Sequence, residues 1–257
     1  MVAPQLRPIQ EEDWLLPDTE ADVWLDDKCK LMIERRDEVF AMTDAGETPS
    51  EEAADLVAKV TGRNGQDAET ALEAAAASVS DDLCILVPSE NGFVLGAASL
   101  CAPTYWSLTE NIGKTLGGLH SPVPGGDPEL AGRISRVFSG LKPGKCLERF
   151  NWTVQLDGER FTPSSAPMKR ELAGLLPQEA AKRLYLRVER QTIRKLPESG
   201  GVLFTIRICV DPLAPLLSDS GMCASFADSW QTTSKSLAAY KGWPHYEAAV
   251  GHLLSID

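Results

Sequence analysis

The order of hydrophobic patterns along the chain predicts an α+β fold with a mostly antiparallel sheet. Over the first eighty residues, apolar side chains recur at spacings of three and four, which is the period of an amphipathic helix. From Leu83 onward the pattern changes to short apolar runs joined by turns that contain glycine or proline, which is typical of strands. Two further helical patterns follow the last run. Because helices and strands are segregated along the chain, we expect an antiparallel sheet with helices beside it.

The first eighty residues are expected to form an arm followed by a layer of helices. Residues 1–18 contain three prolines and are interpreted as an irregular arm, which Trp14 can anchor to the rest of the protein. The periodic segments that follow carry two signals of helix ends, a capping serine at Ser50 and a terminal glycine at Gly62. The expected helices span about residues 22–42, 50–62 and 67–79.

Five apolar runs in the second part of the chain predict the strands. The first two are separated by a short turn that contains glycine, so they predict a β-hairpin. The expected strands span residues 83–87, 93–101, 146–156, 184–196 and 202–210. Further helices are expected at about residues 127–141, 223–239 and 244–254. We therefore divide the chain into an arm with a helical layer, residues 1–80, and a core with C-terminal helices, residues 81–257, packed as one compact unit.

Composition excludes several classes of partner and site. The net charge of −12 repels phosphate backbones, so nucleic acid is not an expected partner. The six cysteines occur singly, without a Cys-x-x-Cys pair, which argues against ribbon-type zinc sites and iron–sulfur binding runs. Single cysteines are typical of a reducing cytoplasm. No apolar run reaches the length of a membrane span, and the first residues do not have the pattern of a signal peptide. We therefore expect a cytoplasmic protein without a membrane partner.

A short segment rich in proline, residues 119–126, holds His120, one of only three histidines in the chain. Each proline disfavours a helical conformation in the residue before it, so Ser121 and Val123 are expected to be extended. The two glycines that follow allow a sharp turn. A stiff segment of this kind can hold an imidazole at a fixed angle, for example as an axial metal ligand. The alternative is a proline-rich turn that contains a histidine by chance.

Charged residues interrupt the last two expected strands. A charged side chain on the inner face of a sheet must be paired or must contact a charged ligand. The planar fork of arginine suits carboxylates, which it can bind through two hydrogen bonds. The alternative is an exposed face with cross-strand ion pairs, in which Glu189 pairs with one of the arginines. The arginines concerned are Arg187, Arg190, Arg194 and Arg207.

Seven blocks of sequence, in order along the chain, carry a likeness to one protein family. The blocks are LMIERRDEVF at residues 31–40, DLCIL at 82–86, AASLCAPTYW at 97–106, LHSPVPG at 119–125, Asn151-Trp152, LRVERQTIRKLP at 186–197 and VLFTIR at 202–207. In these blocks the chain resembles the α-subunit family of haem-dependent oxidative N-demethylases. The likeness runs from about residue 7 to about residue 240. One position departs from the family pattern, because Gly126 stands where an aromatic residue commonly follows the Pro-Gly pair.

The resemblance implies a PAS-like core, which is an antiparallel sheet with helices around a cofactor cavity, and haem b as the cofactor. His120 is the implied axial ligand of the iron, and a cysteine thiolate from Cys101 or Cys209 is the alternative. The side chains expected to bind the haem propionates are Arg187, Arg190, Arg194 and Arg207. The aromatic side chains expected to line the macrocycle are Trp106 and Trp152, with Tyr105 beside them, although such residues are also common in plain hydrophobic cores.

The same resemblance implies an oxidoreductase, a monooxygenase that demethylates a small secondary amine such as dimethylamine with O₂ and releases formaldehyde. The chain contains no Gly-x-Ser-x-Gly elbow, no Walker phosphate loop and no Gly-x-Gly-x-x-Gly after a strand. If the chain performs this reaction, electrons must come from elsewhere, and the resemblance implies a separate reductase that carries flavin and iron–sulfur centres. The alternative is a PAS-like protein that binds haem or a small ligand and acts as a sensor. The sequence assigns no distal acid or base.

Overall fold

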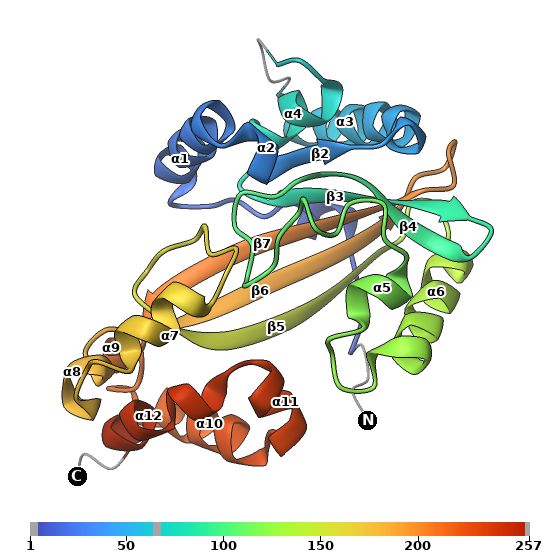
Figure 1. Ribbon diagram of the computed structural model, residues 1–257. Helices are drawn as coiled ribbons and strands as arrows, with labels where there is room; N and C mark the ends of the chain where they lie inside the picture. The colour runs from blue at the N-terminus through green and yellow to red at the C-terminus, as the bar shows by residue number, and fades with distance from the viewer. Residues whose placement is uncertain (1–4, 64–67, 255–257) are drawn as a thin grey trace.

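The computed structural model describes residues 5–63 and 68–254, which contain one seven-stranded antiparallel sheet with helices on both faces (Figure 1). The strand order is β1-β5-β6-β7-β3-β4-β2, and every neighbouring pair is antiparallel. The strands are β1 (Arg7–Ile9), β2 (Phe40–Met42), β3 (Asp82–Ser89), β4 (Gly92–Ser99), β5 (Cys146–Leu156), β6 (Leu184–Lys195) and β7 (Val202–Pro212). The predicted α+β class is confirmed.

The five predicted strands are present as β3 to β7, whereas the two edge strands were not predicted. The helix expected over residues 22–42 breaks at Arg35, whose backbone leaves the helical region at φ −140°. It divides into α1 (Ala21–Glu34), α2 (Arg36–Val39) and strand β2, which pairs with β4. Part of the N-terminal arm is strand β1, which pairs with β5, so the arm is less irregular than predicted. The short helix η1 (Glu11–Asp13) follows it.

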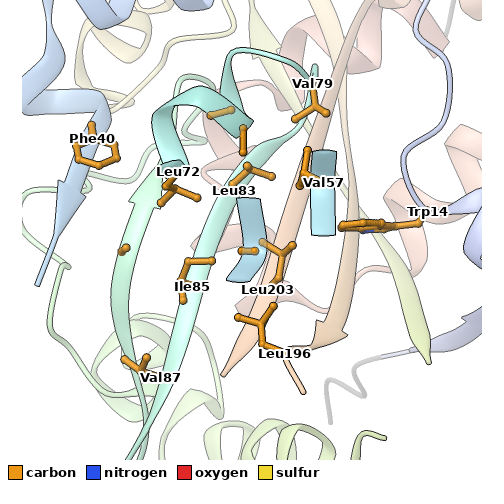
Figure 2. Packing of buried hydrophobic residues seen from close by; sticks show 14 of the residues in the cluster. Trp14, Phe40, Val57, Leu72, Val79, Leu83, Ile85, Val87, Leu196 and Leu203 are labelled. Carbon is orange, nitrogen blue, oxygen red and sulfur yellow. The ribbon is translucent and has the colours of Figure 1, made fainter. Parts of the chain in front are cut away.

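The expected helical layer covers one face of the sheet. It consists of α1, α2, η2 (Asp44–Gly46), α3 (Glu47–Thr61) and α4 (Ala71–Ala76), and Figure 1 shows α3 and α4 beside β2 and β3. Helix α3 ends at Gly62 in the left-handed region, φ +66°, as predicted. Figure 2 shows how Val57 and Leu72 from this layer meet Leu83 and Leu203 from the sheet. The arm and the helical layer therefore share a hydrophobic core with β3 and β7.

A second set of helices packs on the opposite face. It consists of α5 (Leu116–His120), a turn of π-helix, η3 (Gly126–Leu130), and α6 (Ala131–Gly140). Phe138 of α6 packs edge-on against Phe93, with 5.2 Å between the ring centroids. The same cluster contains Phe204 and Ile206 of β7, whereas Leu203 belongs to the core on the other face. Successive side chains of β7 therefore point to opposite faces of the sheet and contribute to two separate apolar cores.

The remaining helices surround one end of β5 and β6. They are α7 (Ala166–Leu172), α8 (Pro177–Ala181), α9 (Leu213–Leu216), α10 (Ser220–Thr232), α11 (Lys235–Tyr240), η4 (Trp243–His245) and α12 (Glu247–Leu254). Their core includes Leu156 and Leu184 from the sheet and Phe226 from α10. In Figure 1 the C-terminal helices lie below β5. Within the described residues, no helix combines the length and the apolar character needed to span a membrane.

Candidate functional site

A cavity of about 420 Å³ lies between the sheet and the helices α5 and α6. Its volume falls in the range typical of sites for small molecules and cofactors. Apolar side chains form most of the wall, among them Leu86 on β3, Ile193 on β6 and Phe204 on β7. Residues of α5, α6 and α11 complete it. Elements that are far apart in the sequence therefore meet around one mainly apolar cavity.

His120 lies in the wall of this cavity, at the last residue of α5. Its Nδ1 is 2.8 Å from the carbonyl oxygen of Leu116, one turn earlier in the same helix. A carbonyl can only accept, so Nδ1 carries the proton and the lone pair of the neutral ring lies on Nε2. Burial lowers the pKa of His120, which favours this neutral form. In a typical metal-binding histidine, one ring nitrogen donates a hydrogen bond to a protein oxygen and the other, unprotonated nitrogen binds the metal.

The segment after His120 forms two consecutive turns and not an extended arm. Ser121 has helical backbone angles, φ −54° and ψ −33°, so the prediction that it is extended is wrong. The N–H of Val123 donates to the carbonyl oxygen of His120 at 2.9 Å, and the N–H of Gly126 donates to Val123 at 2.7 Å. These hydrogen bonds outweigh the weak steric preference that proline imposes on the residue before it.

Gly126 closes this pair of turns directly against His120. A Cβ atom on Gly126 would lie 1.8 Å from the carbonyl oxygen of His120, so no side chain fits there. Gly125, just before it, has the left-handed backbone that glycine tolerates best, φ +70°. Gly126, the position at which the sequence departs from the family pattern, is therefore the residue that allows the turn to pack on His120.

One carboxylate, that of Glu189 on β6, lies in the cavity wall. It accepts hydrogen bonds from Thr104 Oγ1 at 2.5 Å, Gln191 Nε2 at 2.6 Å and Asn151 Nδ2 at 3.2 Å. Only 8% of Glu189 is exposed. Three neutral donors thus stabilise a buried negative charge, and Thr104, Asn151 and Gln191 themselves line the cavity.

Two cations also line the cavity, Arg149 on β5 and Lys241 just after α11. The Nε atom of Arg149 is buried and has no hydrogen-bond partner within the described residues. The Nζ of Lys241 donates to Asn151 Oδ1 at 2.9 Å and to the carbonyl oxygen of Trp152 at 2.5 Å. The pKa of Lys241 is lowered to about 8, chiefly by burial; the charge of Glu189 opposes this shift and that of Arg149 adds to it.

Arg187 lies behind the cavity wall. It is fully buried, and its guanidinium donates to the Thr104 hydroxyl at 2.8 Å, the Ala102 carbonyl at 2.7 Å and the Gln155 amide oxygen at 3.2 Å. The backbone carbonyl of Arg160 accepts from it as well. Arg187 itself is not among the described residues that line the cavity. Its donors are used by the protein, and through Thr104 it supports the surroundings of Glu189.

The other three arginines predicted to bind a ligand lie on the opposite face of the sheet. Alternation along the strands directs them toward the arm and the helical layer, where each meets a carboxylate. Arg190 pairs with Glu148 at 2.6 Å, Arg194 with Glu11 at 2.9 Å, and Arg207 with Asp81 at 2.5 Å. None of the three is among the described residues that line the cavity. This placement differs from the expectation that they hold the carboxylates of a ligand, because protein groups already neutralise them.

The two tryptophans predicted to line a macrocycle are in different places. Trp106 lines the cavity, and so does its neighbour Tyr105, which has an unusual left-handed backbone, φ +54°. Trp152 is not among the described lining residues. Its ring packs instead against Trp243, with centroids 4.6 Å apart, and against Phe226, at 5.7 Å. Trp152 therefore belongs to the core beneath the C-terminal helices.

The alternative iron ligands are poorly placed. Neither Cys101 nor Cys209 is among the described residues that line the cavity. Burial raises the pKa of the Cys101 thiol to about 12, and Cys209 is exposed. Cys84 does line the cavity, but burial raises the pKa of its thiol as well. His245 and His252 are exposed, in agreement with their interpretation as surface residues. Of the groups considered from the sequence, His120 is the one with a suitable donor atom at the cavity.

A family model described as "haem-dependent oxidative N-demethylase, alpha subunit-like" matches residues 24–251. The chain belongs to this family. The match covers most of the chain and includes the whole cavity wall except Leu6. The resemblance noted in the sequence is thereby confirmed. Members of this family are named for dependence on haem, and the term alpha subunit implies a partner subunit.

The cavity of this demethylase-like chain fits a haem on three structural grounds. Its wall is mainly apolar and includes Trp106, as a flat macrocycle requires. His120 offers a neutral Nε2, and a haem iron needs only one protein ligand. Arg149 provides a buried donor without a protein partner, which suits the charged edge of the cofactor.

Sequence reasoning did not single out Arg149, Lys241 or the position of Glu189 in the cavity. A signal was present for the first of these. Arg149, Asn151 and Thr153 alternate along β5, so a period of two places them on one face. All three line the cavity. Lys241 lies at the end of a C-terminal helix, and no local pattern connects it with β5.

Proposed function

We propose that this protein binds haem b in the cavity through His120 and catalyses oxidative N-demethylation of a small secondary amine, with electrons from a separate reductase. The observation that carries the proposal is the hydrogen bond from His120 Nδ1 to the Leu116 carbonyl, which leaves Nε2 available to an iron. The PAS-like description of the core is part of the same proposal. Its support is the antiparallel sheet with helices that line a cavity beside it.

Each group in the wall has a role in this proposal. The Leu116 carbonyl orients His120 and makes it a stronger ligand. The apolar side chains keep water out of the cavity. Glu189 can attract the protonated amine, because three hydrogen bonds hold its carboxylate at a fixed position in the wall. Bound haem supplies the oxidative chemistry with O₂, and the protein supplies position and electrostatics.

The expected products are formaldehyde and an amine with one methyl group fewer. The chain has no sequence motif for a nicotinamide dinucleotide, so electrons must come from another protein. We propose a reductase subunit with flavin and iron–sulfur centres as this partner. The family description as an alpha subunit supports a partner of some kind.

The test begins with absorption spectra of the haem-loaded protein and of His120→Ala, both oxidised and reduced. We expect a Soret band that shifts or disappears in His120→Ala and is unchanged in His245→Ala, a control at an exposed histidine. Absence of the band in the wild-type protein would rule out the proposal. A band that His120→Ala leaves unchanged would place the iron elsewhere.

The second stage measures formaldehyde after addition of dimethylamine, O₂ and a reductase or chemical reductant. Formaldehyde that depends on the amine and on the reductant supports the enzyme. Ligand-dependent changes in the spectrum without formaldehyde would favour the alternative, a haem-binding sensor.

A further inference from the structure

Among the described residues that line the cavity, positive charge exceeds negative charge. Arg149 and Lys241 line it together with one carboxylate, that of Glu189, and the other described lining residues are neutral or apolar. Glu189 already accepts hydrogen bonds from three neutral donors. The chain as a whole has a net charge of −12, so a net positive cavity is opposite in sign to the protein around it.

Both cations have donors that protein groups do not use. Arg149 has five N–H donors, and within the described residues its buried Nε has no hydrogen-bond partner. Lys241 has three N–H donors and uses two of them, both on neutral oxygens. One N–H of Lys241 therefore remains for a ligand.

The two cations lie in the same part of the wall, because Lys241 donates to Asn151, which is two residues along β5 from Arg149 and lines the cavity beside it. Burial disfavours the charged form of each, although the charge of Glu189 favours it, and the charge of Arg149 also disfavours the charged form of Lys241. A ligand with a carboxylate would relieve both effects. It could accept two parallel hydrogen bonds from the fork of Arg149 and one from Lys241.

We infer that Arg149 and Lys241 form the carboxylate-binding end of the cavity, and that the bound ligand places at least one carboxylate against them. The inference rests on the proposed function in one respect, because the propionates of haem are the carboxylates expected there. It assigns this role to a residue of β5 and a residue just after α11, and not to the arginines of β6 and β7. Those arginines already have carboxylate or carbonyl partners in the protein.

Binding of three porphyrins to the haem-free protein tests the inference without enzymatic activity. The probes are haem, metal-free protoporphyrin IX and the dimethyl ester of protoporphyrin IX, in which both carboxylates are blocked. The variants are Arg149→Met and Lys241→Met. The matched control is Lys145→Met, which removes the same charge at an exposed position four residues before Arg149. Fluorescence quenching measures Kd, and circular dichroism establishes that each variant is folded.

We expect Arg149→Met to weaken binding of the metal-free diacid by about tenfold to a hundredfold, which is the range for hydrogen bonds to a charged group. Lys241→Met should weaken it by a smaller factor. Binding of the dimethyl ester should change by less than about twofold in each variant, as should every affinity in Lys145→Met. Arg149→Lys, which keeps the charge without the fork, should recover part of the loss and serves as a second variant if Arg149→Met does not fold.

Equal weakening of diacid and ester would overturn the inference, because the side chain would then act only by packing. Unchanged diacid binding in Arg149→Met would overturn it as well. The proposed function can fail separately. If the diacid depends on Arg149 but His120→Ala leaves the haem spectrum unchanged, the carboxylate site stands and the iron ligand does not.

Succinate, a small dicarboxylate, distinguishes a site for haem propionates from a site for a free carboxylate. If no porphyrin binds but succinate raises the melting temperature of the wild-type protein and not that of Arg149→Met, the site takes a free carboxylate and the haem proposal fails. If neither porphyrins nor succinate bind in a manner that depends on Arg149, the inference is wrong.

Discussion

Arg190 on β6 and Arg207 on β7 are direct partners in the sheet register, and each is neutralised by a different carboxylate. Arg190 pairs with Glu148 at 2.6 Å, and Arg207 pairs with Asp81 at 2.5 Å. Like charges opposite each other destabilise a sheet unless each has its own partner. Both guanidinium groups also donate to backbone carbonyls of the N-terminal arm, at Trp14 for Arg190. This pair therefore fastens the arm to the sheet.

The first prediction concerns the Arg207–Asp81 ion pair. Asp81→Asn leaves the guanidinium of Arg207 buried without a counter-charge, because Asp81 is fully buried and Arg207 is only 8% exposed. We expect a loss of about 3–5 kcal/mol in the free energy of unfolding, measured with urea. The control is Asp27→Asn, which breaks an exposed pair with Lys30 and should cost at most about 1 kcal/mol. Similar losses in the two variants would contradict the prediction.

The second prediction concerns the contact between Gly126 and His120. Gly126→Ala puts a Cβ atom only 1.8 Å from the carbonyl oxygen of His120, so the turn must open and the imidazole must move. We expect lower stability and a haem spectrum altered in the same direction as in His120→Ala. Gly132→Ala, in helix α6, is the control, because the nearest atom to its Cβ is the end of the Arg136 side chain at 3.8 Å. Alanine there should be neutral or stabilise by up to about 1 kcal/mol. A normal spectrum in Gly126→Ala would contradict the prediction.

The third prediction separates the two tryptophans. Trp106→Leu changes the cavity wall and should weaken porphyrin binding and shift the Soret band. Trp152→Leu removes contacts with Trp243 and Phe226 and should mainly lower the free energy of unfolding, by roughly 2–4 kcal/mol. Porphyrin titrations and urea unfolding of both variants measure the two effects. If Trp152→Leu weakened porphyrin binding more than Trp106→Leu, the placement of Trp152 outside the cavity wall would be contradicted.

The central strands could be predicted from the sequence, and the edge strands could not. The expected strand over residues 146–156 coincides with β5, because a long apolar alternation between turn residues has few other interpretations. Strand β2 has only three residues, Phe40–Met42, and they continue the helical spacing of the segment before them. The helix breaks at Arg35, which is neither a glycine nor a proline and so gives no sequence signal of a helix end. Pairing with β4 decides the conformation, and that partner is distant in the sequence.

The site was only partly predictable for a related reason. His120 was found because it lies in a distinctive local motif. Three of the arginines of β6 and β7 pair with carboxylates of the protein, whereas Arg187 donates to neutral oxygens. Alternation along a strand predicts two faces but does not indicate which face lines the cavity. The answer depends on which helices cover each face. Arg149 and Lys241 come from elements about ninety residues apart, and only the fold brings them together.

The last prediction is a pH dependence of stability that arises from Lys241. Burial lowers its pKa to about 8 in the folded protein, whereas the usual value is 10.5. Between these values the unfolded chain holds a proton on this amine that the folded protein has released. Stability rises with pH wherever the unfolded state binds more protons, so Lys241 makes the free energy of unfolding increase from about pH 8 to about pH 10.

Lys241→Met removes this contribution, so the free energy of unfolding of the wild-type protein should rise relative to that of Lys241→Met across this interval. Urea unfolding of both proteins at pH 7, 8, 9 and 10 measures the difference. Arg149→Met provides a directional control. Loss of the neighbouring positive charge raises the pKa of Lys241, so the rise should begin at a higher pH, while Glu189 still favours the charged amine. Parallel curves for the wild-type protein and Lys241→Met would mean that the amine titrates as it does in the unfolded chain, and that Lys241 is not held in the apolar surroundings that its carboxylate-binding role requires.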